Sequence, residues 1–382
     1  MHFSAELLAL AQAVLGVRVV WRLLRTGYDV PIRAVPPGDV QSGRVTVVVP
    51  VLNESDRLRP CLEGLLAQGD EVAEIVVVDG GSSDHTPDLV RDFARRDRRL
   101  RLIEAGTSPA GWNGKVWGLA NAERELRPGQ HWLLTVDADV RPSPALTRSL
   151  VARAEARDLR LLSVATAQRL SGAAEGFLHP ALLSTLVYRF GRPGGATRSS
   201  TSAMANGQCC LIRRDLLRQL GGFQTVRASL CEDVTLARLA ARAGAQVGFY
   251  EAENLVEVAM YAGGGDVWRN WPRSLATRDA LFGRAGWLGL LEVLLVQALP
   301  LPVVVLGRPT GIAKRLNLLL LMLRVGMLVG IARAYPSRPV TYWLSPLLDL
   351  PAALALWRSA LRRQHVWRGH SYTREKGHIV AA

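Results

Sequence analysis

Short apolar runs alternate with amphipathic segments along residues 44–142 of the chain. Four runs are rich in β-branched residues or leucine, as in strands buried on both faces of a sheet, and they lie at 44–50, 74–81, 100–105 and 131–140. The segments between them have helical spacing and turn residues at their borders. Strands that alternate with helices at these intervals predict an α/β fold with a doubly wound, mostly parallel, Rossmann-like sheet.

Residues 143–285 continue this domain with a less regular pattern. We expect a helix at 143–156, a strand at 159–166, a loop of small residues at 195–207 and a helix at 231–244. The predicted α/β domain therefore covers residues 44–285 and divides into two halves, 44–142 and 143–285.

From Gly286 onward the composition changes to long apolar segments. Three of them, at 286–306, 316–332 and 340–357, approach the roughly 17–25 residues that cross a bilayer as a helix. The first contains Glu292 and two prolines, so it either spans the membrane or lies at its interface. We predict C-terminal transmembrane or interfacial helices over residues 286–361.

The first 25 residues form one more apolar segment. Arg18, Arg22 and Arg25 share a helical face near its end, which is the reverse of the charge order in a signal peptide. Two interpretations fit, a spanning anchor with cytoplasmic arginines or an amphipathic helix on the membrane surface. Residues 26–43 are rich in proline and glycine and predict a linker.

Arginine dominates the charge of the chain. The formal net charge of the 382 residues is +14, and Lys115, Lys314 and Lys376 are the only lysines. Such a balance suits anionic lipids, phosphate-bearing substrates or nucleic acid. The sequence has no zinc-finger spacing, RNA-binding aromatic motif or basic repeat, which argues against nucleic acid.

The basic tail at 362–382 predicts the topology. The positive-inside rule places it on the cytoplasmic side of the membrane. Two spans and one interfacial segment after a cytoplasmic α/β domain return the tail to that side. We therefore expect a protein of a bacterial-type inner membrane, with its α/β domain on the cytoplasmic face.

Two carboxylates lie at the end of the fourth apolar run. Asp137 and Asp139 are separated by one residue, and Arg141 and Pro142 end the strand geometry just after them. Open α/β sheets bind ligands at the carboxyl ends of their strands. Paired carboxylates suit Mg²⁺ or Mn²⁺, which take one or two carboxylates together with substrate phosphates. A solvated loop is the alternative for this pair taken alone.

Polar residues also follow the first two predicted strands. Pro50, Asn53 and Glu54 come just after the first strand, where the amide and the carboxylate either hydrogen-bond ribose hydroxyls or a base edge or cap the next helix. Asp79 ends the second strand, and the adjoining Gly80 lets a nucleotide approach the backbone closely.

Charged residues begin two of the predicted helices. Lys115 lies in GWNGKVWG, where glycines and a helix N-terminus attract phosphate; a solvated surface lysine is the alternative. Glu232 and Asp233 begin the helix at 231–244. There they either complement the helix dipole or supply a carboxylate that takes a proton from a reacting hydroxyl.

Four motifs occur along the chain in the order RVTVVVPVLNES, EIVVVDGGSSDHT, DAD and CEDVTLA. In this order they resemble glycosyltransferase family 2, the inverting enzymes of the GT-A fold, over about residues 44–280. The membrane-rich end and the tail sequence WRGHSY are similar to the subgroup associated with hopanoids and carotenoids. The resemblance implies a nucleotide-sugar half at 44–142 and an acceptor half at 143–285.

The resemblance also implies roles on the donor side. Asp79 would contact a uracil ring, and Gly80 stands where the family often has a second acid, which leaves the donor specificity open. Lys115 would face the donor. Asp139 would coordinate a divalent cation that bridges the diphosphate, and Asp137 would hold the ribose or a water molecule near that metal.

On the acceptor side the resemblance assigns the general base to Asp233, the second acid of the pair that begins with Glu232. Asn206, Gly207 and Gln208 would line the acceptor side of the pocket, although a polar entry into a strand explains them equally well.

The chain departs from the family after this point. Processive members carry a Q-x-x-R-W motif, whereas this chain has WRNWPRS at 268–274. Trp271 becomes a candidate for acceptor binding and Arg273 for binding of the diphosphate. This departure and the small membrane region argue against a polysaccharide synthase that threads its product through the membrane.

Together these features predict a membrane-anchored, metal-dependent inverting glycosyltransferase. It would move a sugar from a nucleoside diphosphate donor, a UDP-sugar, to a lipid or isoprenoid acceptor. Transfer to a polyprenyl phosphate is the alternative reaction. A non-catalytic membrane scaffold with the same fold is the second alternative.

Overall fold

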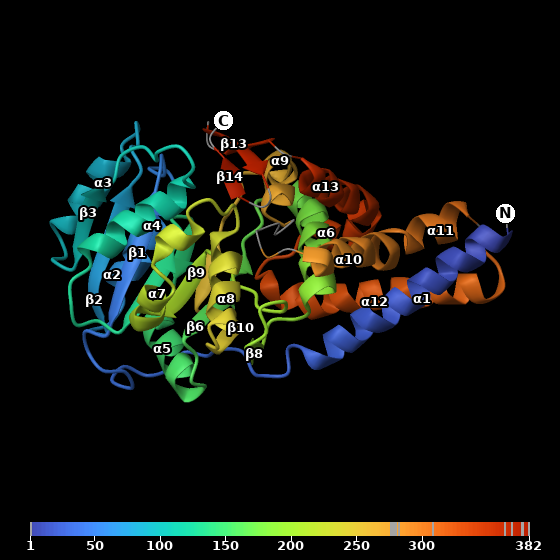
Figure 1. Cartoon of the computed structure of the whole chain (residues 1–382), viewed down its shortest axis with the longest axis horizontal. Coiled ribbons are helices and arrows are strands. Elements are labelled where there is room, and N and C mark those ends of the chain that lie inside the picture. The colour runs from blue at the N-terminus through green and yellow to red at the C-terminus, as the bar shows by residue number, and fades with distance from the viewer. Residues whose placement is uncertain are drawn as a thin grey trace.

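Eight strands form the central sheet of the computed structural model (Figure 1). They are β1 Val45–Val51, β2 Val72–Asp79, β3 Leu100–Glu104, β4 Trp132–Val136, β6 Leu161–Ala165, β8 Gly195–Thr197, β9 Cys209–Arg213 and β10 Val247–Glu251. Their order across the sheet is β3-β2-β1-β4-β9-β6-β10-β8. The first four are parallel, β9 runs antiparallel between β4 and β6, and β10 is parallel to β6. The prediction of a mostly parallel α/β sheet is confirmed.

The structure describes residues 2–275, 281, 283–307, 309–362, 364–367, 370–375 and 378–380. For residues 2–5, 273–274 and those after 362, only the backbone is described.

Helices cover both faces of the sheet because the strands are apolar on both sides. Val47 and Val49 join the core on one face, where α2 Leu58–Leu66, α3 Thr86–Ala94 and α5 Leu146–Ala156 pack. Val48 joins the core on the other face, where α4 Gly114–Glu125, α7 Arg214–Gln219, the 3₁₀ helix η1 Phe223–Val226 and α8 Glu232–Arg242 pack. Adjacent residues of a strand point to opposite faces, so a run of valines serves both cores.

Two smaller sheets complete the strands. One has β5 Val140–Pro142, β11 Val256–Val258 and β7 Ala167–Gln168, in the order β5-β11-β7. The other lies in the basic tail and has β12 Gln364–Trp367, β13 His370–Glu375 and β14 His378–Val380. The predicted linker at 26–43 runs along the α/β domain, where Ile32 is buried and forms a parallel bridge with Ala252.

The remaining helices extend away from the sheet (Figure 1). They begin with α1 His2–Arg25 and continue with α10 Gly283–Glu292, the π-helix η2 Val293–Ala298, α11 Pro300–Leu306 and α12 Gly311–Ile331. We call these helices the arm. Helices α6 Ala173–Phe190, α9 Gly264–Leu275 and α13 Asp349–Leu361 lie between the arm and the sheet, with the 3₁₀ helices η3 Ala332–Ala334 and η4 Val340–Leu348.

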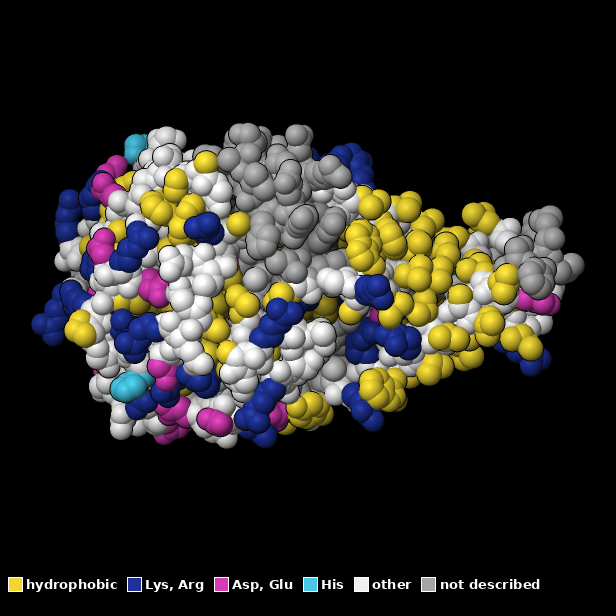
Figure 2. Space-filling view, in the orientation of Figure 1, with side chains coloured by type: hydrophobic (Ala, Val, Ile, Leu, Met, Phe, Trp, Pro, Cys, Tyr) yellow, Lys and Arg dark blue, Asp and Glu magenta, His cyan; other side chains and the backbone are white. Residues whose placement is uncertain are grey.

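The arm has the composition of a membrane-inserted structure. Within the described residues three helices are long and apolar enough to cross a membrane, at Glu6–Arg25, Gly283–Leu306 and Gly311–Ala334. Hydrophobic side chains cover its visible surface, and basic side chains gather where it joins the α/β domain (Figure 2).

The segment at 340–357 differs from the sequence expectation of one spanning helix. It divides into η4 and α13 at Leu348, after Pro346. The side chain of Asp349 is buried and forms an ion pair with Arg324, at 2.7 Å between Oδ2 and Nε. A proline and a buried carboxylate at this point explain why the apolar run is not one continuous span.

Candidate active site

The loops after β1 and β2 are joined by side chains that the sequence assigns to the donor. The carboxylate of Asp79 accepts hydrogen bonds from the backbone N–H groups of Gly81 and Ser82, at 3.0 and 2.9 Å, and from the Ser82 hydroxyl at 2.5 Å. Asn53 has a φ of 54°, and its side-chain oxygen accepts from the backbone of Ser83 at 2.9 Å. Both side chains therefore shape the loops, and their contacts with uracil or ribose stay predictions.

Other residues that the sequence predicts to bind the donor also lie at the ends of these two strands. Glu54 is buried and forms an ion pair with Arg57, at 2.8 Å. Gly80 donates its N–H to the carbonyl of Val51 at 2.9 Å, so the ends of β1 and β2 stay side by side. Pro50 lies in β1 opposite Val78 of β2. These backbone contacts hold the carboxyl ends of β1 and β2 next to each other.

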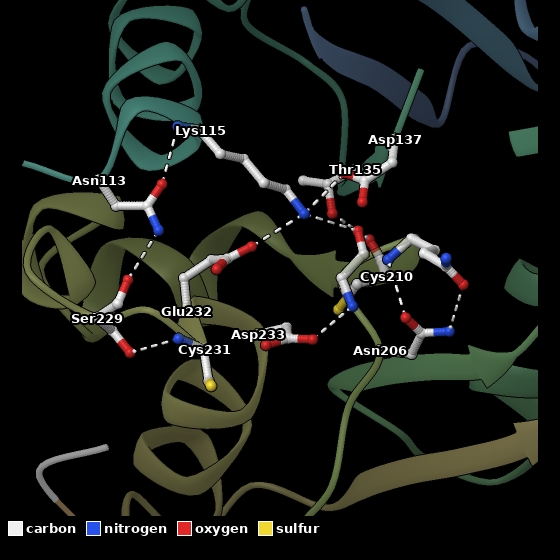
Figure 3. Close-up of polar contacts among 12 residues, drawn as sticks. Asn113, Lys115, Thr135, Asp137, Asn206, Cys210, Ser229, Cys231, Glu232 and Asp233 are labelled. Carbon is white, nitrogen blue, oxygen red and sulfur yellow. Dashed lines mark hydrogen bonds and ion pairs between the residues drawn. The ribbon is translucent and has the colours of Figure 1, made fainter. Parts of the chain in front are cut away.

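Lys115 is the centre of an ionic cluster that joins the two halves of the domain (Figure 3). Its Nζ lies 2.7 Å from Asp137 Oδ1 and 2.9 Å from Glu232 Oε1. It also donates to the carbonyl of Gly207 at 3.1 Å. Burial alone would lower the pKa of the Lys115 ammonium, but the surrounding carboxylates, led by that of Asp137, raise it above its ordinary value.

The start of α4 holds Lys115 in place. Asn113 caps this helix, because its side-chain oxygen accepts the N–H of Lys115 at 2.9 Å. The Asn113 amide also donates to the carbonyl of Ser229 at 2.9 Å, just before α8 (Figure 3). A single capping residue therefore sets the distance between Lys115 and the acids that begin α8.

Asp233 points into the same cluster from α8. Its Oδ2 accepts the N–H of Gly207 at 2.6 Å, and its Oδ1 accepts the N–H of Val234 at 2.8 Å. Burial, with the neighbouring carboxylate of Glu232, raises the pKa of Asp233 to about 7, although Lys115 and the two N–H donors oppose this shift. A carboxylate with a pKa near neutrality is suited to take and release a proton.

The predicted acceptor residues 206–208 divide into two roles. The amide of Asn206 donates to the carbonyl of Val164 at 3.2 Å and to Gln208 Oε1 at 3.0 Å. The same oxygen of Gln208 accepts the hydroxyl of Thr166 at 2.5 Å. The side chains of Asn206 and Gln208 thus form hydrogen bonds with residues at the end of β6. The backbone of Gly207 instead contacts both Lys115 and Asp233.

A side chain at position 207 has no room. An added Cβ would lie 2.7 Å from Lys115 Nζ, 3.2 Å from Glu232 Oε1 and 3.3 Å from Asp233 Oδ2. The sequence indicated Gly207 either as part of the lining of the acceptor side or as part of a polar entry into a strand, and gave no sign of its contacts with Lys115 and Asp233. In the sequence, a glycine between two polar residues is the only sign of this role. The role becomes clear when the structure places Lys115, Glu232 and Asp233 around this glycine.

Asp137 and Asp139 fit a divalent cation by their chemistry. Both follow β4 at the carboxyl edge of the sheet, and such metals take one or two carboxylates along with phosphate oxygens. Across the described part of the chain no group of three or more His, Cys, Asp or Glu side chains is close enough to hold a metal. Further ligands would therefore have to come from the donor and water.

A thiol lies near the two carboxylates. Burial, followed by the charges of Asp139 and Asp137, raises the pKa of the Cys61 thiol well above its ordinary value. These effects disfavour the thiolate, which is the form that binds metals.

Trp271 and Arg273 both lie in α9. The Trp271 ring is buried and stacks on His179, with 3.8 Å between the ring centroids. The side chain of Arg273 lies outside the described residues, as does the side chain of every residue in the WRGHSY tail.

One cavity of about 1270 Å³ connects the ionic cluster with the arm. Lys115, Asp137, Glu232 and Asp233 line its polar end, together with the backbone of Gly207. Its apolar part is lined from three helices, by Val20, Leu23 and Leu24 of α1, Leu183, Leu186 and Val187 of α6, and Leu323, Gly326, Met327, Gly330 and Ile331 of α12. Trp271 lies on the wall of the same cavity.

The sheet and its acidic edge define an α/β protein of the GT-A class. A solved structure with a similar fold is the mannosyltransferase PcManGT from Pyrobaculum calidifontis, in complex with GDP-Man and Mn²⁺. The TM-score is 0.55 at 17% identity, and the match covers 94% of this chain and 97% of that chain. At this identity the likeness shows the fold alone.

Residues 46–221 match the family model described as Glycosyl transferase family 2. This part of the chain is a glycosyltransferase family 2 domain. The succinoglycan biosynthesis protein ExoO of Rhizobium meliloti is 33% identical over 123 residues, which is 32% of each chain. The probable glycosyltransferase YdaM of Bacillus subtilis is 26% identical over 212 residues, or 55% of this chain and 49% of the relative. The chain thus spans about a third and about half the length of these two relatives.

Proposed function

We propose that the chain is an inverting glycosyltransferase of the membrane surface. It transfers a sugar from a nucleoside diphosphate donor, a UDP-sugar, to a hydroxyl group of a lipid or isoprenoid, as in the hopanoid- and carotenoid-associated subgroup. The observation that carries this proposal is the cavity. It joins the carboxylates of a glycosyltransferase domain to apolar walls made by helices of membrane-spanning length.

Asp233 is the general base of the proposed reaction. As the acceptor oxygen attacks the anomeric carbon, the hydroxyl proton moves to the Asp233 carboxylate, and the bond to the diphosphate breaks on the opposite face of the sugar. The N–H of Gly207 orients Oδ2 of this carboxylate. Glu232 and Lys115 position it by their mutual ion pair, at 2.9 Å.

Asp139 and Asp137 hold a divalent cation on the donor side of the proposed site. A cation bound there would act as a Lewis acid that stabilises the charge of the leaving diphosphate. The Mn²⁺ in the complex of PcManGT with GDP-Man supports this assignment by analogy. Arg273 of α9 stays a candidate for binding the diphosphate on the sequence alone, and the loops shaped by Asn53 and Asp79 would hold the nucleotide.

The proposed topology places the three long apolar segments of the arm, Glu6–Arg25, Gly283–Leu306 and Gly311–Ala334, in the bilayer. α10 to α11 leads away from the α/β domain and α12 returns to it, so the basic tail comes back to the side of the α/β domain (Figure 1). The basic side chains where the arm meets the domain support a cytoplasmic location for both, by the positive-inside rule (Figure 2).

The substitution Asp233→Asn tests the base. We expect transfer to fall by about 10²–10⁴-fold, the usual contribution of a general base, while calorimetry finds UDP binding nearly unchanged. The matched control is Asp215→Asn, which changes an exposed carboxylate at the start of α7. Undiminished turnover of Asp233→Asn would refute the assignment.

The pH dependence supplies a second test of the same residue. The base works deprotonated, so the rate of the wild type should rise with pH through about 7 and level off above it. The charged or titratable groups around Asp233 are Glu232 on its own helix, Lys115 from α4 and Cys210 from β9. The rising limb should be absent from whatever activity Asp233→Asn retains.

A polyprenyl phosphate acceptor is the second candidate. Arg25, Arg192 and Arg333 line the cavity beside the arm, where they would suit an anionic acceptor. Such an acceptor carries no proton at pH 7 that a base must remove. A transfer rate that neither falls in Asp233→Asn nor rises through pH 7 would favour this reaction.

A further inference from the structure

Helices α1 and α12 of the arm are joined by a pair of buried polar side chains. The side chains of Gln12 in α1 and Asn317 in α12 are buried and exchange hydrogen bonds, at 3.0 and 3.2 Å. One turn further along, an added Cβ at Gly16 would lie only 3.3 Å from Leu320. The helices are therefore in close contact in this part of the arm.

Toward the α/β domain the same helices diverge (Figure 1). Val20, Leu23 and Leu24 of α1 then face the cavity, opposite the α12 residues from Leu323 to Ile331. We call this wedge-shaped part of the cavity, between α1, α6 and α12, the wedge. It is continuous with the end of the cavity that holds Glu232 and Asp233.

Ion pairs on the other side of α1 keep the wedge open. Arg18 and Arg22 both bind the buried carboxylate of Glu292 in α10, at 3.1 and 2.7 Å. α1 is thus fixed to α10 by these pairs and to α12 by the Gln12–Asn317 contact. Neither contact leaves α1 free to close onto α12 near the α/β domain.

Two glycines of α12 line the wedge. Gly326 and Gly330 are one helical turn apart and line the cavity. An added Cβ at either position would have no atom within 4 Å. A Cβ at these positions therefore enters open space, and the rest of a leucine side chain would occupy part of the wedge.

We propose that the wedge holds the apolar body of the acceptor lipid, which enters from the bilayer, and that Gly326 and Gly330 determine which acceptors fit. This inference rests on the proposed function and names the site for the part of the acceptor that does not react. The volume favours it, because about 1270 Å³ exceeds the ~300–1,000 Å³ of ordinary small-molecule pockets. The polar end of the lipid then lies at the carboxylates, and its chain points along the arm.

The occupant follows from the surroundings of the wedge. Its walls are apolar, and it lies within the part of the chain whose exposed surface is apolar, including Leu319, Met322 and Val325 of α12. In the proposed topology this surface faces lipid. A molecule that reaches the wedge from that side must itself be lipid, with one polar end.

The test is photo-crosslinking of the full chain in detergent micelles with a diazirine analogue of geranylgeraniol. In the wild type we expect crosslinks in peptides that contain residues 20–24 and 323–331, identified by mass spectrometry. The double variant Gly326→Leu, Gly330→Leu should lose at least about tenfold of this crosslinking, a change of ~1.4 kcal/mol in binding.

The matched control is Val325→Leu, Val329→Leu, on the same helix one position away. These valines are 54% and 61% exposed and do not line the cavity, so crosslinking should stay within about twofold of the wild type. Leucine favours a helix more than glycine does, so the glycine variant should fold. Release of UDP from UDP-glucose without acceptor should be equal in all three proteins.

The outcomes separate the two proposals. Unchanged crosslinking of the glycine double variant, or crosslinks spread evenly over the exposed faces of the arm, would overturn the wedge. A further outcome is a protein that binds the probe in the wedge but neither releases UDP nor transfers a sugar from any UDP-sugar tested. Crosslinking that depends on the glycines would then support the lipid site in the wedge, and the lack of transfer would refute the proposed reaction.

Discussion

Replacement of Gly207 by alanine tests the ionic cluster with a single methyl group. The new Cβ would lie 2.7 Å from Lys115 Nζ, whereas non-bonded heavy atoms approach to about 3.5 Å at best. The ammonium must therefore move by about 0.8 Å. Its contacts with Asp137 and Glu232, at 2.7 and 2.9 Å, are already at the length of charge-assisted hydrogen bonds, so a shift of this size would disturb at least one of them.

The expected loss follows from these contacts. A hydrogen bond to a charged group is worth ~1.5–3 kcal/mol, so the loss of one such contact at the site corresponds to a roughly 10- to 150-fold lower rate. The backbone at position 207 has no positive φ, so alanine adds no backbone strain there. We expect kcat to fall by this factor while the melting temperature changes little.

The assay is steady-state transfer, with UDP release followed at saturating donor and acceptor. Gly118→Ala in α4 is the matched control, because its Cβ would lie at an ordinary 3.5 Å from Pro50. It should keep kcat within about twofold. If the activity of Gly207→Ala stays within about twofold of the wild type, the contacts among Lys115, Gly207 and Asp233 are not needed for transfer, and the proposed site is refuted.

Two further substitutions test the metal site and the arm. Asp139→Ala should abolish the gain in UDP-sugar binding that Mn²⁺ provides, measured by calorimetry with and without the metal; an unchanged gain would exclude this ligand. Asp349→Ala leaves the buried Arg324 without its bidentate partner and should cost ~3–5 kcal/mol of stability in detergent. Arg33→Ala, which breaks the exposed pair with Glu253, should cost at most ~1 kcal/mol, and equal losses would contradict this account.

The strands of the first half could be predicted from the sequence because burial on both faces leaves a continuous apolar run. The expected strand at 44–50 is observed as β1 Val45–Val51, and that at 100–105 as β3 Leu100–Glu104. The helix expected at 231–244 is observed as α8 Glu232–Arg242. Short elements such as β5 and β8 were not predicted, since three residues carry too little periodicity.

The site could be predicted only in part. The sequence indicated Lys115, Asp137 and the pair Glu232 and Asp233 as separate features, and the structure brings the three carboxylates around the Lys115 ammonium. It did not indicate that Asp79 binds the loop that follows it, or that Asn53 binds the neighbouring loop after β2, because loop hydrogen bonds depend on backbone angles. The wedge was beyond sequence reasoning, since its walls come from segments about 300 residues apart.

That separation has a consequence for biosynthesis. Gln12 and Asn317 are 305 positions apart, so α1 has left the ribosome long before its partner helix exists. At ~5–20 residues per second the delay is roughly 15–60 s. During this time the first half of the sheet can fold, whereas the hydrogen bonds between Gln12 and Asn317 cannot yet form. A nascent chain would therefore gain a place for a nucleotide sugar well before it gains a place for a lipid.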